Sequence, residues 1–189
     1  MGRYKVVDEN DMELGPHTIG ELLVRPLIPH VILKEYINMP EKTIAAWHDL
    51  WFHTGDYAYY DEEGYFYFVD RKKDALRRRG ENISSYEVEK VINSHPAVLE
   101  SAVIATHSDV GEDEVMACLT LKQGKALKPL ELIAYCEERT AYFMIPRYLR
   151  FMDSLPKTAT GRVQKYTLRE IGVTSDTWDR ETVGYKIKR

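Results

Sequence analysis

Residues 51–74 read WFHTGDYAYYDEEGYFYFVDRKKD and decide the fold of the first part of the chain. The runs 57–60 and 65–69 are rich in aromatic and β-branched side chains, which are typical of strands. Turn-forming residues at 61–64 separate them, so the pattern predicts a β-hairpin. We expect Asp56 in a tight turn just before the hairpin. Pairing of the two strands would then bring it to the same edge as Arg71.

Asp56 carries a carboxylate and Arg71 a guanidinium, and these two groups can bind a ribose from two sides. A carboxylate accepts hydrogen bonds from the sugar hydroxyls, and a guanidinium donates to the same oxygens or to a nearby phosphate. On spacing alone, Asp56 is better explained as a turn aspartate that caps its own backbone. Arg71 alone reads as a solvated hairpin charge. The neighbouring motifs reverse this preference and favour a nucleotide site.

The composition bounds the classes of protein that fit. A chain of 189 residues that is 44% apolar can bury a core and form one or two domains. The net charge of −4 gives no indication of nucleic acid or an anionic membrane as partner. Cys118 and Cys136 lack CxxC spacing and fit small core residues in a reducing compartment. Without a signal-peptide pattern or a membrane-span run, we expect a cytoplasmic protein.

The pattern along the chain predicts an α+β fold in two parts. Residues 1–70 form a short β-rich subdomain that looks like a piece of something larger, and residues 71–189 form a small α+β domain with a three-stranded sheet and flanking helices. Further strands are expected at 4–7, 20–25, 100–106, 115–121 and 148–152, and helices at 40–47, from the capping box at 84–87 to His95, at 129–139 and at 166–171. The charged residues 70–80 read as an exposed connector or hairpin edge.

Four blocks carry a family resemblance: Thr-Gly-Asp at 54–56, Asp-Arg-Lys-Lys-Asp at 70–74, Gly-Glu-Asn-Ile-Ser at 80–84, and Leu-Pro-Lys-Thr-Ala-Thr-Gly at 155–161. In order and separation they resemble the carboxyl-terminal portion of AMP-forming acyl-CoA synthetases, in the acyl-adenylate-forming superfamily. The resemblance covers nearly the whole chain. The closing residues 178–189 are most similar to ligases of the crotonobetaine/carnitine-CoA type.

The resemblance implies a two-step reaction. A carboxylic acid attacks the α-phosphate of Mg-ATP to give an acyl-adenylate and pyrophosphate, and the thiol of coenzyme A then displaces AMP. The implied ligands are therefore ATP or AMP, Mg²⁺, coenzyme A and a small-molecule carboxylic acid, and a homo-oligomer is compatible with the pattern. Residues 1–70 would be the end of the large adenylation domain, and residues 71–189 a mobile lid domain.

The resemblance also implies roles for individual residues. Asp56 and Arg71 would hold the ribose, Lys73 would be the hinge, and Arg79 and Gly80 would contact coenzyme A. The arginine run at 77–79 is more typical of a solvated face, and contact with the phosphates of coenzyme A is the alternative. Glycine suits a loop that approaches a thin ligand closely.

Two departures from the family pattern stand out. The family places a lysine directly after the glycine of the last block, where this chain has Arg162; Arg162, or Lys165 three residues later, is the expected catalytic cation. The family's glycine-rich phosphate loop and its adenine- and magnesium-binding block are not among these 189 residues, so most of the Mg²⁺ site would lie elsewhere and the chain alone should not turn over.

Alternatives in other classes remain open. The chain fits a non-catalytic module that binds coenzyme A or a partner, or an adenylating domain that serves a carrier protein. The six histidines are scattered, and His48 and His53 flank Trp51 without metal-ligand spacing. The sequence therefore predicts no metal ligands.

Overall fold

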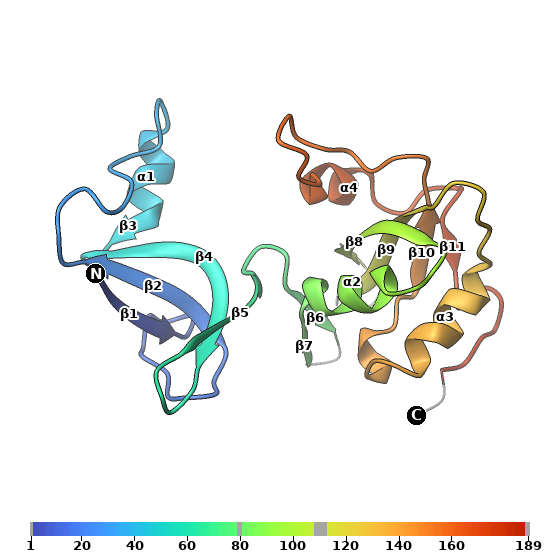
Figure 1. The fold of residues 1–189 in the computed structure, drawn as a ribbon, viewed down its shortest axis with the longest axis horizontal. Helices are drawn as coiled ribbons and strands as arrows, with labels where there is room; N and C mark the ends of the chain where they lie inside the picture. The colour runs from blue at the N-terminus through green and yellow to red at the C-terminus, as the bar shows by residue number, and fades with distance from the viewer. Residues whose placement is uncertain (1, 79–80, 108–112, 188–189) are drawn as a thin grey trace. The chain divides into compact units, whose positions relative to one another are not determined.

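The computed structural model describes residues 2–78, 81–107 and 113–187 (Figure 1). Backbone contacts divide the chain into two compact units, Met1–Lys73 and Asp74–Arg189. Among the described helices, none is both long and apolar enough to cross a membrane.

The first unit is built on a five-stranded sheet. Its strands are β1 (Gly2–Val7), β2 (Gly20–Pro26), β3 (Trp47–His48), β4 (Trp51–Tyr60) and β5 (Phe66–Arg71). The order is β1-β2-β4-β3, β5 also pairs with β4, and every pairing is antiparallel. The short helix α1 (Pro40–Ala46) buries none of its residues. The core of this unit is correspondingly small, with Val6, Val7, Leu23, Phe52 and Ala58 as its buried hydrophobic residues.

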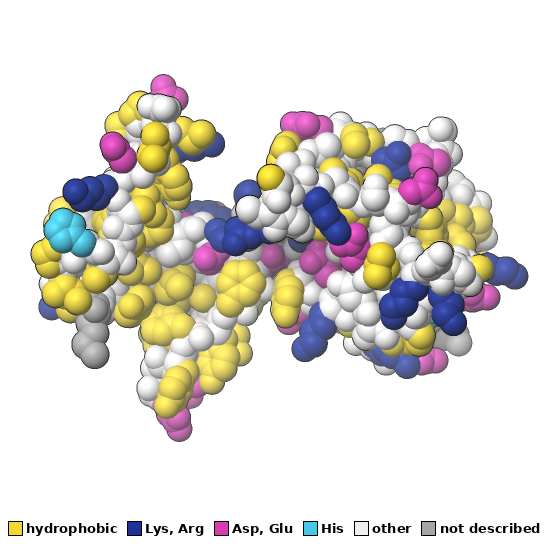
Figure 2. Space-filling view, turned by 45° about the horizontal axis from the view of Figure 1, so that its top comes forward, with side chains coloured by type: hydrophobic (Ala, Val, Ile, Leu, Met, Phe, Trp, Pro, Cys, Tyr) yellow, Lys and Arg dark blue, Asp and Glu magenta, His cyan; other side chains and the backbone are white. Residues whose placement is uncertain are grey.

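The first unit also exposes large hydrophobic side chains. Figure 2 shows them gathered over much of the visible face of this unit. They include Phe68 on β5, which is 57% exposed, and Ile44 on α1, which is 72% exposed. Apolar surface of this extent on a soluble protein usually marks a face that another element covers.

The predicted hairpin is confirmed as β4–β5. Its register runs from Tyr60 opposite Phe66 to Asp56 opposite Arg71. Asp61 closes the loop, because its Oδ1 accepts hydrogen bonds from the backbone N–H groups of Glu63 and Tyr65, at 3.0 Å each. This pairing places Asp56 and Arg71 side by side on adjacent strands.

The second unit contains a mixed four-stranded sheet in the order β11-β10-β9-β8. Its strands are β8 (Val98–His107), β9 (Asp113–Leu121), β10 (Tyr148–Phe151) and β11 (Trp178–Asp179). The sheet was predicted to have three strands, and the structure has four. The missing strand β11 spans only two residues in a polar tail. An ion pair of 3.1 Å between Arg147 and Asp179 helps to hold it, and a two-residue strand has no readable period.

Three helices and a 3₁₀ turn complete the second unit. They are α2 (Ser85–Asn93), α3 (Pro129–Glu137), η1 (Tyr142–Met144) and α4 (Lys165–Ile171). The predicted cap of α2 is confirmed, since Ser84 Oγ accepts a hydrogen bond from Glu87 N–H. The helices pack through their apolar faces: Val88 and Ile92 of α2, with Leu132, Ile133 and Cys136 of α3, belong to one core cluster.

The connector after Asp70 forms a second small hairpin, β6 (Leu76–Arg78) with β7 (Glu81–Ile83). The prediction of a solvated arginine face was wrong for Arg78, which is 2% exposed. Its guanidinium donates to the carbonyls of Phe143 and Ile145 and pairs with Glu114 at 2.8 Å. Alternation explains the error, because successive residues of a strand face opposite sides, and Arg77 is the exposed one.

Candidate nucleotide-binding site

The Thr-Gly-Asp motif lies inside the long strand β4, not in a tight turn as expected. Leu23 of β2 pairs with His53, whereas Glu21 of β2 pairs with Tyr57, so the extra residues of β4 bulge between these two positions. A glycine followed by a polar residue reads as a turn, but Gly55 serves here as a bulge residue with φ of +69°. The bulge sets Asp56 at the point where β4 changes register.

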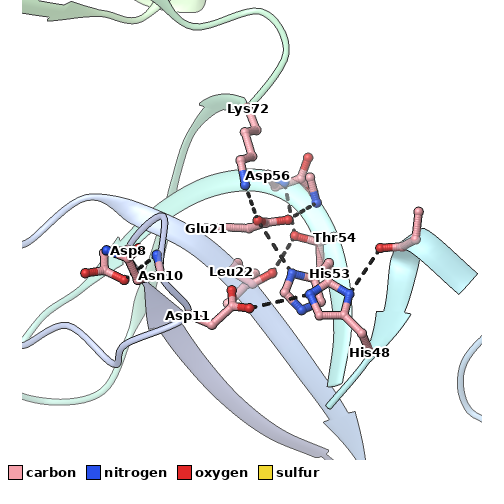
Figure 3. Close-up of polar contacts among 12 residues, drawn as sticks. Asp8, Asn10, Asp11, Glu21, Leu22, His48, His53, Thr54, Asp56 and Lys72 are labelled. Carbon is pink, nitrogen blue, oxygen red and sulfur yellow. Dashed lines mark hydrogen bonds and ion pairs between the residues drawn. The ribbon is translucent and has the colours of Figure 1, made fainter. Parts of the chain in front are cut away.

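Side chains from β2 and β4 fix this bulge (Figure 3). Thr54 Oγ1 donates to the carbonyl of Leu22 at 2.7 Å and accepts from Asp56 N–H at 3.1 Å. The N–H of Gly55 donates to Glu21 Oε1 at 3.1 Å. The backbone groups that a bulge removes from the strand ladder are thus bonded to side chains instead.

Asp56 and Arg71 form a close ion pair, with 2.9 Å between Arg71 Nε and Asp56 Oδ1. The Asp56 side chain is 26% exposed and that of Arg71 is 50% exposed. Although the atoms are close, they are not aligned as a hydrogen bond, and the buried Oδ1 accepts none from the described residues. Burial is the main cause that raises the pKa of Asp56; Arg71 opposes the rise and Glu21 adds to it.

Glu21 is a site residue that sequence reasoning missed. It is 5% exposed, and besides Gly55 it pairs with Lys72 Nζ at 2.7 Å. This bond is the main cause that raises the pKa of Lys72. One signal was present: Glu21 sits two positions before the apolar Leu23, so both share the inward face of β2. Its contacts, however, reach residues more than thirty positions away.

Lys73 is exposed and is the last residue of the first unit. Lys72 on one side is bonded to Glu21 within the first unit. Asp74 on the other side pairs with Arg169 of α4 within the second unit. Lys73 therefore lies between two residues that are each bonded within their own unit.

Arg162 lies on a small exposed loop after β10. The loop closes through a bridge between Lys157 and Val163 and through a bond of 2.8 Å from Thr158 N–H to the Arg162 carbonyl. Gly161 has φ of +81°, a conformation that glycine adopts at little cost. In the described part of the chain, the Arg162 guanidinium makes no hydrogen bond or ion pair. It is free to meet an anion.

Lys165 lies at the start of α4 and is already paired. Its Nζ donates to Ser85 Oγ at 2.6 Å and lies 2.7 Å from Glu89 Oε1, both on α2. The Lys165 side chain is 16% exposed. The structure thus uses Lys165 to fasten α4 to α2 and does not direct it toward the loop of Arg162. Arg79 and Gly80, the expected coenzyme A contacts, lie outside the described residues.

Comparison with known proteins assigns part of this chain to a domain family. Residues 87–162 match the model of the AMP-binding enzyme C-terminal domain. These residues belong to that domain family. This match includes the last of the four sequence blocks, and together with the relatives described next it confirms the expected resemblance.

Relatives and solved structures agree with this assignment. The crotonobetaine/carnitine–CoA ligase of Citrobacter koseri is 37% identical over 163 residues, which cover 86% of this chain and 32% of that protein. The o-succinylbenzoate CoA synthetase MenE of Bacillus subtilis, in complex with its acyl-adenylate intermediate, is 33% identical with a TM-score of 0.79, covering 89% of this chain and 34% of MenE. ATP-bound MatB of Rhodopseudomonas palustris is also 33% identical with a TM-score of 0.79, covering 90% of this chain and 34% of MatB. The chain spans about a third of the proteins it matches.

Proposed function

We propose that this chain is the carboxyl-terminal part of an ATP-dependent acid–CoA ligase. The whole enzyme would activate a carboxylic acid as an acyl-adenylate and transfer the acyl group to coenzyme A. The observation that carries the proposal is the pair formed by Asp56 and Arg71 beside the Thr-Gly-Asp bulge. It places a carboxylate acceptor next to a permanent cation.

Asp56 and Arg71 have the chemistry of a ribose site. The ionised Asp56 carboxylate would accept hydrogen bonds from the two hydroxyls of the AMP sugar, and Arg71 would donate to the same hydroxyls or to the phosphate. Glu21 would act as a positioning residue, because it holds the bulge through Gly55. Binding of this kind orients the α-phosphate but does not itself break a bond.

Lys73 is the proposed hinge between the two units, and Arg162 is the proposed cation for the adenylation step. The guanidinium of Arg162 would offset the charge that develops on the substrate carboxylate and the α-phosphate. We also propose that Arg79 and Gly80 border the coenzyme A path. Coenzyme A chemistry and two buried free thiols, Cys118 and Cys136, suit a reducing cytoplasm.

Mg²⁺ would enter bound to ATP. Within the described ranges, the one cluster of three potential ligands contains two histidines, which is not the all-oxygen set that Mg²⁺ prefers. The roles proposed for the residues of this chain therefore do not include holding the ion. The exposed apolar face of the first unit supports the proposal that residues 1–70 end a larger adenylation domain, since such a domain would cover that face.

The choice between Arg162 and Lys165 can be tested in a chimera in which this chain replaces the matched third of B. subtilis MenE. We expect Arg162→Met to slow formation of the acyl-adenylate in a single turnover by roughly 10²–10³-fold, the usual loss for one charge-stabilising donor. Lys165→Met should leave that rate within about threefold and lower the melting temperature instead, because Glu89 loses its ion pair with Lys165.

Two outcomes would count against these assignments. An unaltered adenylation rate in both Arg162→Met and Arg162→Lys chimeras would remove the role given to Arg162. A large rate loss in Lys165→Met with an unchanged melting temperature would move the role to Lys165. A chimera that folds but makes no o-succinylbenzoyl-CoA would contradict the proposed function itself. The 189-residue chain alone is expected to show no turnover.

A further inference from the structure

Three side chains that the ligase proposal does not use meet on the first unit: Asp11, His48 and His53 (Figure 3). One potential ligand atom from each lies within 4.8 Å of the other two. Asp11 comes from the loop between β1 and β2, His48 from β3 and His53 from β4. The prediction that the histidines lack metal-ligand spacing considered sequence distance alone, and the fold brings in a carboxylate from 37 positions before His48.

The β3–β4 hairpin explains why the two histidines meet. Its turn residues Asp49 and Leu50 both have positive φ, 50° and 66°, as a two-residue hairpin loop requires. The register pairs His48 with Trp51, so His48 and His53 lie diagonally on one face of the hairpin. Their rings stack with centroids 3.5 Å apart and planes 19° apart. A metal ion lies in the plane of each imidazole that binds it, so the exposed ring of His48 has to turn out of this stack for both histidines to bind one ion.

The loop that carries Asp11 is also held in place. Asp8 Oδ1 accepts hydrogen bonds from the backbone N–H groups of Asn10 and Met12, at 2.8 and 2.9 Å. Asp11 itself has φ of 61°, in the left-handed region. Its Oδ2 lies 3.5 Å from His48 Nε2. Ligands about 2.0–2.2 Å from a tetrahedral Zn²⁺ lie roughly 3.3–3.6 Å apart, so this separation already fits one edge of such a site.

The Nδ1 atom of each imidazole lies near an oxygen atom of the protein. His48 Nδ1 lies 3.2 Å from the carbonyl oxygen of Ala45. His53 Nδ1 lies 3.6 Å from Glu21 Oε2. A proton on Nδ1 pointing at an oxygen leaves the lone pair on Nε2, and metal-binding histidines usually have this kind of support from a carbonyl or carboxylate.

We propose that Asp11, His48 and His53 bind a divalent transition-metal ion of the Zn²⁺ type. Two imidazole nitrogens and one carboxylate oxygen are ligands that Zn²⁺ accepts, and a water would complete a tetrahedron. The ion would clamp the β1–β2 loop to the β3–β4 hairpin. It would be structural, because the ligands are distinct from the Asp56–Arg71 pair.

The test is a titration of the full 189-residue chain with Zn²⁺ alone, by calorimetry and by thermal shift. We expect one tight zinc ion per chain and a melting temperature that rises with zinc and falls again with a chelator. His48→Gln and His53→Gln should each weaken binding by at least about tenfold. Asp11→Asn, a substitution on an exposed loop that should not disturb folding, should also weaken it.

His17→Gln is the matched control. His17 Nε2 lies 2.7 Å from Glu62 Oε2 on an exposed surface, so it is a histidine–carboxylate pair without the second imidazole. Its zinc affinity should equal that of the unmodified chain. Equal zinc binding by the unmodified chain and a folded His48→Gln/His53→Gln double variant would overturn the proposal. So would a loss in His17→Gln as large as that in His48→Gln.

Discussion

Replacing Asp56 with asparagine is expected to weaken AMP binding by roughly a hundredfold or more in the MenE chimera without destabilising the fold. A hydrogen bond to a charged group contributes about 1.5–3 kcal/mol, and the proposed site makes two of them to the ribose. Asparagine keeps the shape but loses the charge and one acceptor. Calorimetric titration with AMP measures the change directly.

The effect of Asp56→Asn on the melting temperature follows from the direction in which folding shifts the pKa of Asp56. Because burial raises the pKa of Asp56, its ionised form is disfavoured in the folded state. The stability that this group contributes is present in acid, below the unfolded pKa near 3.8, and is lost as the pH rises through the folded pKa. As the pH is raised toward neutrality, the melting temperature of Asp56→Asn should therefore rise relative to that of the unmodified chain.

Glu63→Gln is a suitable control, because it removes one carboxylate charge from the exposed loop of the same hairpin. It should change neither AMP affinity nor melting temperature appreciably. A clear drop in the melting temperature of Asp56→Asn at neutral pH, with AMP affinity retained, would identify Asp56 as a structural residue of the β4 bulge instead.

The second large effect is expected at Arg78. Arg78→Met should destabilise the second unit by about 3–5 kcal/mol, because it leaves the Glu114 charge buried without this partner. The carbonyls of Phe143 and Ile145 would lose their donor as well. Hydrogen exchange followed by mass spectrometry measures the change in β9 without interference from the first unit.

Arg77→Met is the matched control for this variant. The two arginines are adjacent on β6, but Arg77 is exposed and Arg78 is buried. Arg77→Met should therefore change protection of β9 little. The double variant Arg78→Met/Glu114→Gln should recover part of the loss, since the buried charge at position 114 is then removed as well. Equal effects of Arg77→Met and Arg78→Met would contradict the assigned role of Arg78.

Local patterns predicted most of the elements. The β4–β5 hairpin, the cap at Ser84 and the inward faces of α2 and α3 follow from periodicity and turn chemistry, which act over a few residues. The strand β11 was missed because two residues cannot show a period. The burial of Arg78 was missed because three consecutive arginines read as a solvated run, whereas strand alternation turns the middle one inward.

The candidate site was predictable in part for a similar reason. Asp56 and Arg71 are close because a hairpin joins them, and a hairpin can be read from the sequence. The role of Glu21 depends on pairing between β2 and β4, and the cluster of Asp11 with His48 and His53 depends on three separate segments. Contacts between segments distant in the sequence leave no local signal, so only the structure reveals them.

The most direct measurement of the central proposal compares AMP with 2′,3′-dideoxy-AMP, each bound to the unmodified chimera and to Asp56→Asn. If Asp56 accepts hydrogen bonds from the ribose hydroxyls, the unmodified protein should bind AMP at least about tenfold more tightly than the dideoxy nucleotide. Asp56→Asn should bind the two with nearly equal affinity. Equal affinities for the unmodified protein, or the same preference in both proteins, would contradict the ribose site.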